Sequence, residues 1–89
     1  MEWLIELHDD AVKSLNKKII TKNELKETIT KAIRKFKGED VNINIAKLRG
    51  NWTGFYRIKL GKIRLIAYFD FDKKKVFVRD IEYRGKIYK

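Results

Sequence analysis

The chain contains no cysteine, no proline and a single histidine, His8. The missing cysteine excludes disulfide frameworks, thiolate zinc sites, iron–sulfur clusters and cysteine nucleophiles. One histidine also excludes a metal or nuclease centre built on paired histidines. No apolar run is long enough for a membrane span, and the first residues lack the basic start and apolar stretch of a signal peptide. We therefore expect a soluble cytoplasmic protein that has no thiolate or paired-histidine metal site and contacts no membrane.

The chain length leaves room for one small domain. A chain of 89 residues can form a single core with two layers of secondary structure. Its hydrophobic fraction of 44% and aromatic fraction of 12% argue against disorder, although 38% of the residues are charged. We therefore expect residues 1–89 to fold as one domain.

The positive charge is concentrated in the second half of the chain. Residues 1–46 carry nine basic and eight acidic residues, a net charge of +1, whereas residues 47–89 carry thirteen basic and four acidic residues, a net charge of +9. A basic excess confined to half of a small domain is typical of a polyanion partner. The alternative is general solubility charge in a lysine-rich protein, but such charge need not be segregated. The distribution favours contact with nucleic acid.

The first half of the chain predicts a strand and two helices. In residues 2–7 the apolar side chains of Trp3, Ile5 and Leu7 alternate with a more polar set, which predicts a short strand. Asp9 and Asp10 offer an N-cap and negative charge for a helix that we expect to reach about Ile20. The sequence from Thr21 to Glu24 has the form of a capping box, which predicts a second helix that stops near residue 38. Its apolar face comprises Leu25, Ile29, Ala32, Ile33 and Phe36.

The second half of the chain changes to the two-residue period of strands. After a polar connection at residues 38–46, the alternation predicts three strands at residues 54–60, 63–69 and 75–83. Gly61 and Lys62 look like a two-residue hairpin loop, because glycine supplies the positive φ that such turns need. The predicted fold is α+β with the order β-α-α-β-β-β. Its two helices pack on one face of a small antiparallel sheet.

The hairpin register predicts a basic face on this sheet. If Leu60 pairs with Ile63, three further pairs point away from the helices: Lys59 with Arg64, Arg57 with Ile66, and Phe55 with Tyr68. The third strand is expected to add Arg79, and its end Arg84 and Tyr88. Cations ringed by aromatic side chains suit a phosphate backbone with stacked bases. The alternative is a plain solvated face, which antiparallel sheets often have.

Four short motifs lie in this half: KLRG at 47–50, YRIKL at 56–60, IRLIAY at 63–68 and YRGKIY at 83–88. Together with the two preceding helices, their order and spacing resemble the RelE family of toxins, within the RelE/ParE superfamily, over essentially the whole chain. The resemblance implies the toxin of a type II toxin–antitoxin system. Such a toxin enters the ribosomal A site and cuts mRNA there without a metal. The ribose 2′-OH attacks the phosphate, leaving a 2′,3′-cyclic phosphate and a 5′-OH.

The resemblance also implies a set of catalytic residues, namely Arg57, Lys59, Arg64, Arg84 and Tyr88. Arginines bind phosphate oxygens in bidentate fashion, so the three arginines are expected to stabilise the phosphorane. A lysine among other cations releases its proton more readily, which makes Lys59 a candidate general base. The C-terminal tyrosine is expected to stack on a base or to assist proton transfer. The wider set expected to contact RNA comprises Lys47, Arg49, Trp52, Arg79, Tyr83 and Lys86.

One position departs from the family pattern. Many relatives carry histidine where this chain has Tyr83, so a histidine acid or base is lost, and the groups that move each proton stay open. Two other functions also stay open. The same scaffold occurs in ParE-like inhibitors of DNA gyrase, and a basic domain of this kind can bind RNA or the ribosome without cutting it.

The expected partners follow from the charge and from the resemblance. A cationic groove on a domain half with a net charge of +9 should be held by an acidic, partly disordered antitoxin that resembles RelB and folds on binding. The second expected partner is the ribosome with its mRNA and rRNA. The protein alone is expected to be a monomer, and a hetero-oligomer with its antitoxin.

Overall fold

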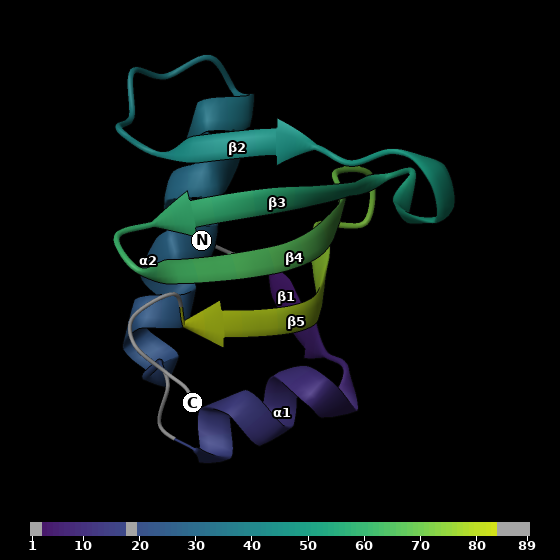
Figure 1. Ribbon diagram of the computed structural model, residues 1–89. Coiled ribbons are helices and arrows are strands. Elements are labelled where there is room, and N and C mark those ends of the chain that lie inside the picture. Colours follow the sequence, from purple (N-terminus) through teal and green to yellow (C-terminus); the bar gives the residue numbers. More distant parts are fainter. Residues whose placement is uncertain (1–2, 18–19, 84–89) are drawn as a thin grey trace.

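The computed structural model describes residues 3–17 and 20–83 and shows two helices against one sheet (Figure 1). The sheet has five strands in the order β1-β5-β4-β3-β2, in which β1 pairs with β5 in parallel and all other neighbours are antiparallel. The elements are β1 (Leu4–Leu7), α1 (Asp9–Asn16), α2 (Lys22–Phe36), β2 (Asn44–Lys47), the 3₁₀ helix η1 (Gly50–Trp52), β3 (Phe55–Leu60), β4 (Ile63–Asp70) and β5 (Lys75–Tyr83).

The predicted α+β class, with helices packed on one face of the sheet, is confirmed, but the count of strands is wrong by one. Strand β2 lies at the end of the segment expected to be a polar connection, and its Ile45 pairs with Ile58 of β3. Four residues are too few for a two-residue period to be recognised in the sequence. This strand depends on its antiparallel pairing with the edge of β3. Strand β1 can pair in parallel with β5 because the connection between them is long. It contains both helices and strands β2, β3 and β4, and it returns the chain to the sheet in the same direction.

The two helices begin at local signals in the sequence. Helix α1 is capped by the side chain of His8, which accepts a hydrogen bond from the Asp10 backbone N–H, and not by an aspartate as expected. It ends at Asn16, earlier than the predicted end. Helix α2 begins with the predicted capping box: Thr21 accepts from the Glu24 amide at 3.0 Å, and the Glu24 carboxylate accepts from the Thr21 amide at 2.9 Å. Neither of the described helices is long and apolar enough to cross a membrane.

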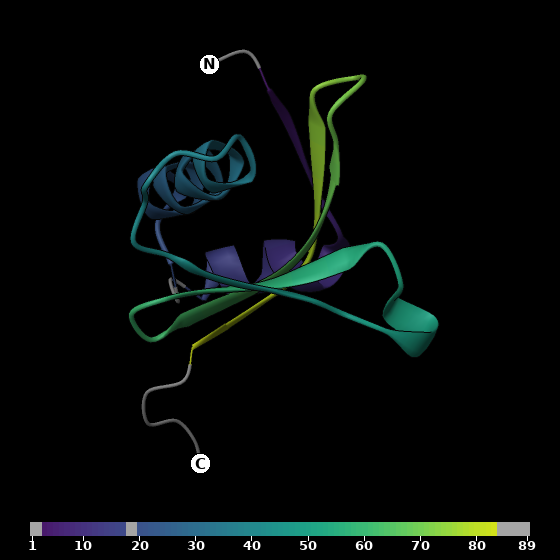
Figure 2. The same cartoon turned by 90° about the horizontal axis from the view of Figure 1, so that it is seen from above.

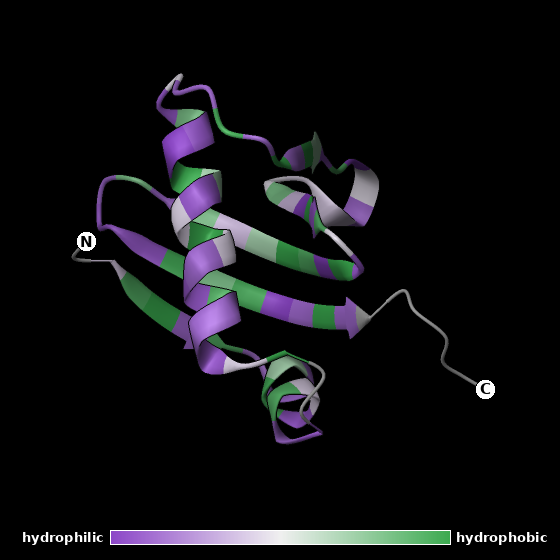
Figure 3. Cartoon of the chain, turned by 90° about the vertical axis from the view of Figure 1, so that its left-hand side faces the viewer, coloured by the Kyte–Doolittle hydropathy of each residue, from purple (hydrophilic) through white to green (hydrophobic). Residues whose placement is uncertain are grey.

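The hydrophobic core lies between α2 and the concave side of a strongly curved sheet (Figures 2 and 3). Strands β3, β4 and β5 contribute fully buried aliphatic side chains to it, and α2 contributes the apolar face that its periodicity predicts. Helix α1 is fastened to β5 by the buried hydroxyl of Ser14, which donates to the Ile81 carbonyl at 2.9 Å. The buried hydrophobic residues are Ala11, Ile20, Leu25, Ile29, Ala32, Ile33, Val41, Ile43, Ile58, Leu65, Ala67, Phe69, Val76, Val78 and Ile81.

The predicted hairpin register is confirmed from Leu60 opposite Ile63 to Phe55 opposite Tyr68. Gly61 in its two-residue turn has a φ of +60°, which an L-residue rarely adopts. The next pair of strands contains a β-bulge that the sequence analysis does not predict. Ile66 pairs with Asp80 and Ala67 pairs with Val78, so Arg79 is the extra residue on β5. A bulge increases the local bend and twist of a strand, in keeping with the curvature of this sheet.

Candidate nucleic-acid interface

The face of the sheet that points away from α2, here called the outer face, is ordered in three rows across β3, β4 and β5. The strand register defines these rows as Phe55, Tyr68 and Phe77; then Arg57, Ile66 and Asp80; then Lys59, Arg64 and Glu82. Each row continues across the strands because the side chains of one face alternate with those of the other. The bulge keeps this alignment and adds Arg79 to the outer face beside the second row. Aromatic and charged side chains therefore occupy separate zones of one surface.

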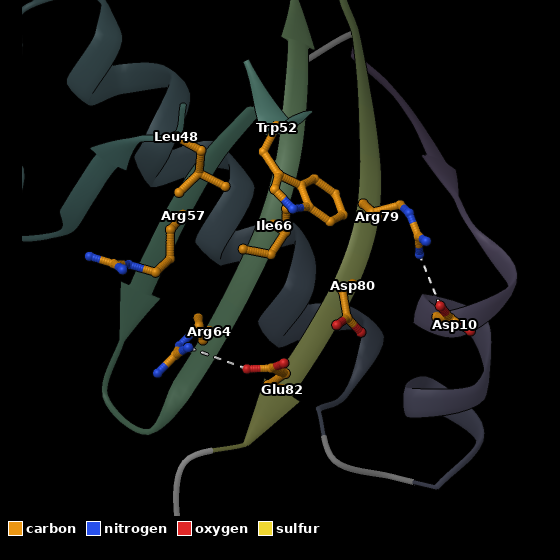
Figure 4. Close-up of a pocket in the computed structure, with 9 residues that line it drawn as sticks. All are labelled: Asp10, Leu48, Trp52, Arg57, Arg64, Ile66, Arg79, Asp80 and Glu82. Atoms are coloured by element: carbon orange, nitrogen blue, oxygen red, sulfur yellow. Dashed lines mark hydrogen bonds and ion pairs between the residues drawn. The ribbon is translucent and has the colours of Figure 1, made fainter. Parts of the chain in front are cut away.

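An open cleft of about 420 Å³ lies over the two charged rows and is here called the arginine cleft (Figure 4). Three arginines from three strands meet in it, together with the indole of Trp52 from η1. Three carboxylates also line it, so the formal charges of its lining sum to zero. The full lining is Asp10, Leu48, Trp52, Arg57, Arg64, Ile66, Arg79, Asp80 and Glu82.

Arg57 and Arg64 hold unused hydrogen-bond donors in this cleft. The Nε atom of each is buried and has no hydrogen-bond partner among the described residues. Arg64 forms a long ion pair with Glu82, at 3.5 Å between Nη1 and Oε1, whereas Arg57 forms none within the described part of the chain. A buried donor without a partner destabilises the free protein by about 1–3 kcal/mol. An anionic oxygen bound to these guanidiniums would satisfy the two donors once the side chains turn to expose them.

Arg79 links the far side of the cleft to the start of α1. Its Nη1 donates to the Asp10 carboxylate at 2.9 Å and lies 3.1 Å from Nδ1 of His8. Its guanidinium also lies over the Trp52 ring, 5.7 Å from the ring centroid, which is a cation–π distance. The hydrogen bond from Arg79 holds the pKa of the Asp10 carboxyl below its usual range. Arg79 therefore fixes both Trp52 and the edge of the cleft.

Of the candidate site residues, the structure brings Trp52, Arg57, Arg64 and Arg79 together in one cleft. Lys59 lies opposite Arg64 in the third row, but it does not line the cleft.

Other predicted site residues lie elsewhere. Lys47 pairs with Tyr56, whose ring packs against Phe36 on the helix side, and Arg49 is exposed just before η1. Tyr83 ends β5, but its side chain is outside the described part of the structure. Arg84, Lys86 and Tyr88 lie outside the described residues.

Three carboxylates of the cleft, those of Asp10, Asp80 and Glu82, are absent from the predicted site. The cations of the outer face were expected to be uncompensated, whereas the ion pairs of Arg64 and Arg79 show that two of them have acidic neighbours. The buried positions of β5 are Val76, Val78 and Ile81, which breaks a two-residue period at one point. That break is the signal from which the bulge, and hence the outward direction of Asp80 and Glu82, can be inferred.

The chain matches no protein-family model and no curated protein sequence. It is similar to solved structures. A chain of the archaeal RelE–RelB complex from Pyrococcus horikoshii is 23% identical with a TM-score of 0.59, and the match covers 98% of this chain and 100% of that chain. A chain of the toxin–antitoxin complex RelBE2 from Mycobacterium tuberculosis is 18% identical with a TM-score of 0.61, covering 94% and 93%.

A mutant of YafQ from E. coli is 19% identical with a TM-score of 0.61, covering 94% of this chain and 96% of that chain. These structures match nearly from end to end, so the likeness concerns the whole arrangement of helices and strands and not one motif. The resemblance indicated by the four sequence motifs is thus confirmed at the level of the fold. The chain has the fold of the RelE-type toxins.

Proposed function

We propose that the chain is the toxin of a type II toxin–antitoxin system, and that it is a ribosome-dependent endoribonuclease which cuts mRNA in the ribosomal A site without a metal. The observation that carries the proposal is the pair of buried, unpartnered Nε–H donors of Arg57 and Arg64 in one open cleft. The fold and the net charge of +9 in residues 47–89 support it.

The cleft suits a phosphodiester better than a neutral ligand. A guanidinium presents several N–H donors in one plane and binds two phosphate oxygens at once. Glu82 competes with a phosphate for the guanidinium of Arg64, but its ion pair with Arg64 is long at 3.5 Å and uses Nη1, not the unpartnered Nε. Asp80 repels such an anion from its side of the cleft. We therefore expect the phosphate to lie nearest Arg57, which has no carboxylate partner within residues 3–17 and 20–83.

The proposed reaction is an internal transesterification of RNA. The ribose 2′-oxygen forms a bond to phosphorus, the bond from phosphorus to the 5′-oxygen breaks, and a 2′,3′-cyclic phosphate and a 5′-OH result. Arg57 and Arg64, together with Arg84 from the sequence analysis, stabilise the charge that develops on the phosphorane. The 2′-OH proton has three candidate acceptors close to these arginines, namely Lys59, Asp80 and Glu82.

We propose an acidic, RelB-like antitoxin as the partner that holds the protein inactive. The structures similar to this chain include two toxin–antitoxin complexes, and the basic half of this chain complements an acidic segment. An acidic protein encoded beside this chain should suppress its toxicity when the two are expressed together. Toxicity that is unchanged by that protein would remove it as the antitoxin.

The decisive experiment is primer extension on an mRNA in a translating extract, with and without the purified protein. We expect cuts within A-site codons that disappear when ribosomes are omitted. The Arg57→Gln and Arg64→Gln variants should lose these cuts. The matched control is Arg34→Gln, because Arg34 also pairs with a glutamate, Glu39 at 2.8 Å, but lies on α2 away from the cleft.

The other outcomes separate the alternatives. Blocked translation without cuts would identify a ribosome-binding protein that lacks nuclease activity. Unaffected translation would contradict the proposal, and inhibition of DNA gyrase would then be measured instead.

A further inference from the structure

A row of aromatic rings crosses the outer face beside the arginine cleft. Phe55, Tyr68 and Phe77 are register partners on β3, β4 and β5. The ring centroid of Phe55 lies 5.7 Å from that of Tyr68 and 6.4 Å from that of Phe77. Trp52 extends the row, with its ring centroid 5.5 Å from that of Phe55. These four side chains are called the aromatic row below.

The row leaves large ring surfaces in water. The Tyr68 side chain is 44% exposed and Trp52 is 42% exposed, although both are large enough to fill a core. Single exposed aromatic residues are common, but a contiguous set on one face of a sheet is typical of a binding surface. The core needs none of the four, because the members of the aromatic row lie on the opposite side of the sheet from the buried Ile58, Leu65 and Val78.

The exposed rings are held in place before any ligand arrives. Tyr68 lies against Gly54, where a Cβ atom would come within 3.3 Å of its ring, and Gly54 has a φ of +96°. Glycine at this position therefore allows the ring to rest on the backbone. Trp52 contacts both the ring of Phe55 and the guanidinium of Arg79. Rings that are already ordered lose little conformational entropy when a ligand binds.

Charge next to the row indicates which ligand it takes. Arg57 follows Phe55 by two residues on β3, which places the next row roughly 7 Å away along the strand. The Arg79 guanidinium lies over the Trp52 ring, and the backbone carbonyl of Arg49 accepts a hydrogen bond from the Trp52 N–H at 3.2 Å. An aromatic surface bordered by arginines suits unpaired bases on a phosphate backbone, because every base has a face that stacks and every phosphate meets a cation. An apolar protein segment would leave Arg57, which has no carboxylate partner among the described residues, without an anion.

We propose that the aromatic row is a base-stacking platform for single-stranded RNA, which takes the bases next to the phosphate in the arginine cleft. The proposal rests on the proposed function only in placing a phosphate in that cleft. Stacking itself needs no cleavage, so it can be measured with RNA that the protein cannot cut.

The test uses a 2′-O-methyl RNA hexamer, which has no 2′-OH nucleophile, and an abasic hexamer of the same charge. Binding is followed by the fluorescence of Trp52 in a Trp3→Phe background, since the chain has only two tryptophans. We expect the hexamer with bases to quench Trp52 and to bind more tightly than the abasic hexamer. Tyr68→Ala should weaken the binding of the hexamer with bases by about 5- to 100-fold and leave the abasic hexamer unaffected.

The matched control is Phe71→Ala. Phe71 is also 44% exposed, but its ring packs against Trp3 and Phe36 on the helix side of the sheet. This variant should bind both hexamers like the parent, and Tyr68→Phe should keep the affinity because it keeps the ring. Circular dichroism checks that each variant is folded. If Tyr68→Ala does not fold, the comparison of the two hexamers on the parent protein still decides the question.

The platform is wrong if the parent protein binds both hexamers equally, or if folded Tyr68→Ala binds the hexamer with bases as the parent does. Loss of binding to an acidic protein partner alone, with RNA binding unchanged, would also overturn it in favour of a protein-docking surface. These results are independent of the nuclease assay. Base-dependent binding without ribosomal cuts would support the base-stacking platform and contradict the proposed nuclease activity. Ribosomal cuts with base-independent binding do the reverse.

Discussion

The same three strands, β3, β4 and β5, present two very different faces. On the helix side their side chains are aliphatic and fully buried, as at Ile58, Leu65 and Val78. On the outer face they are aromatic, basic and acidic, they are partly exposed, and they meet in specific pairs. Burial of apolar surface is non-directional, so the helix side needs volume and little else. The function of the outer face depends on which side chains are neighbours. Because successive residues of a strand point to opposite faces, we expect substitutions at one residue to affect stability and substitutions at the next to affect function.

The largest effect on stability should come from the helix side. Leu65→Ala should lower the free energy of unfolding by about 2–5 kcal/mol, because it leaves a cavity in a fully packed core. Its neighbour Ile66 lines the cleft on the other face and is partly exposed, so Ile66→Ala should lower it less. Urea unfolding of both variants measures the difference. Equal losses for the two would contradict the division between the faces.

The next effect concerns activity alone. Arg57→Gln should lower the rate of mRNA cleavage by about 10²–10³, the usual loss when one donor to a developing negative charge is removed. Its thermal unfolding should be unchanged or shifted slightly upward, since a buried unpartnered Nε–H is removed. Rates come from primer extension and stability from calorimetry. A variant that unfolds much more easily than the parent would show that Arg57 belongs to the structural core after all.

A smaller effect on stability is expected at Ser14, a buried polar residue beside the hydrophobic core. Ser14→Ala removes the buried hydrogen bond to the Ile81 carbonyl and should lower the free energy of unfolding by about 1 kcal/mol. The matched control is Thr30→Ala, where the hydroxyl donates to the Lys26 carbonyl within α2 and the residue is partly exposed. Alanine is the better helix former there, so this variant should be neutral or slightly more stable. Chemical denaturation separates the two, and a neutral Ser14→Ala would mean that the carbonyl is satisfied without the hydroxyl.

The smallest effect is a pH dependence at the edge of the cleft. The hydrogen bond from Arg79 lowers the pKa of Asp10 in the folded protein. A carboxyl with a depressed folded-state pKa contributes stability that is fully present above its unfolded value of about 3.9. This contribution is lost as the pH falls from that value through the folded-state pKa. Carbon-detected NMR titration should show Asp10 titrating below its usual range, and Arg79→Gln should return it toward that range.

The contacts that the sequence determined are local ones. The helix starts, the capping box at Thr21 and the hairpin at Gly61 each depend on residues only a few positions apart. The residues that form them are therefore neighbours in the sequence as well as in the folded protein. The hairpin register then determines which residues of β3 and β4 face the helices. For this reason, the core face and the presence of Arg57 and Arg64 on the outer face were predictable.

The tertiary structure alone decided the features that join distant segments. Three features depend on backbone pairing with a neighbouring strand: strand β2, the parallel pairing of β1 with β5, and the bulge at Arg79. The carboxylate of Asp10 reaches Arg79 across 69 positions of sequence, and no local pattern encodes that meeting. Local periodicity thus determined which side each strand turns to the core, whereas strand pairing between distant segments determined which charges meet in the cleft, because that choice is made only when the whole sheet assembles.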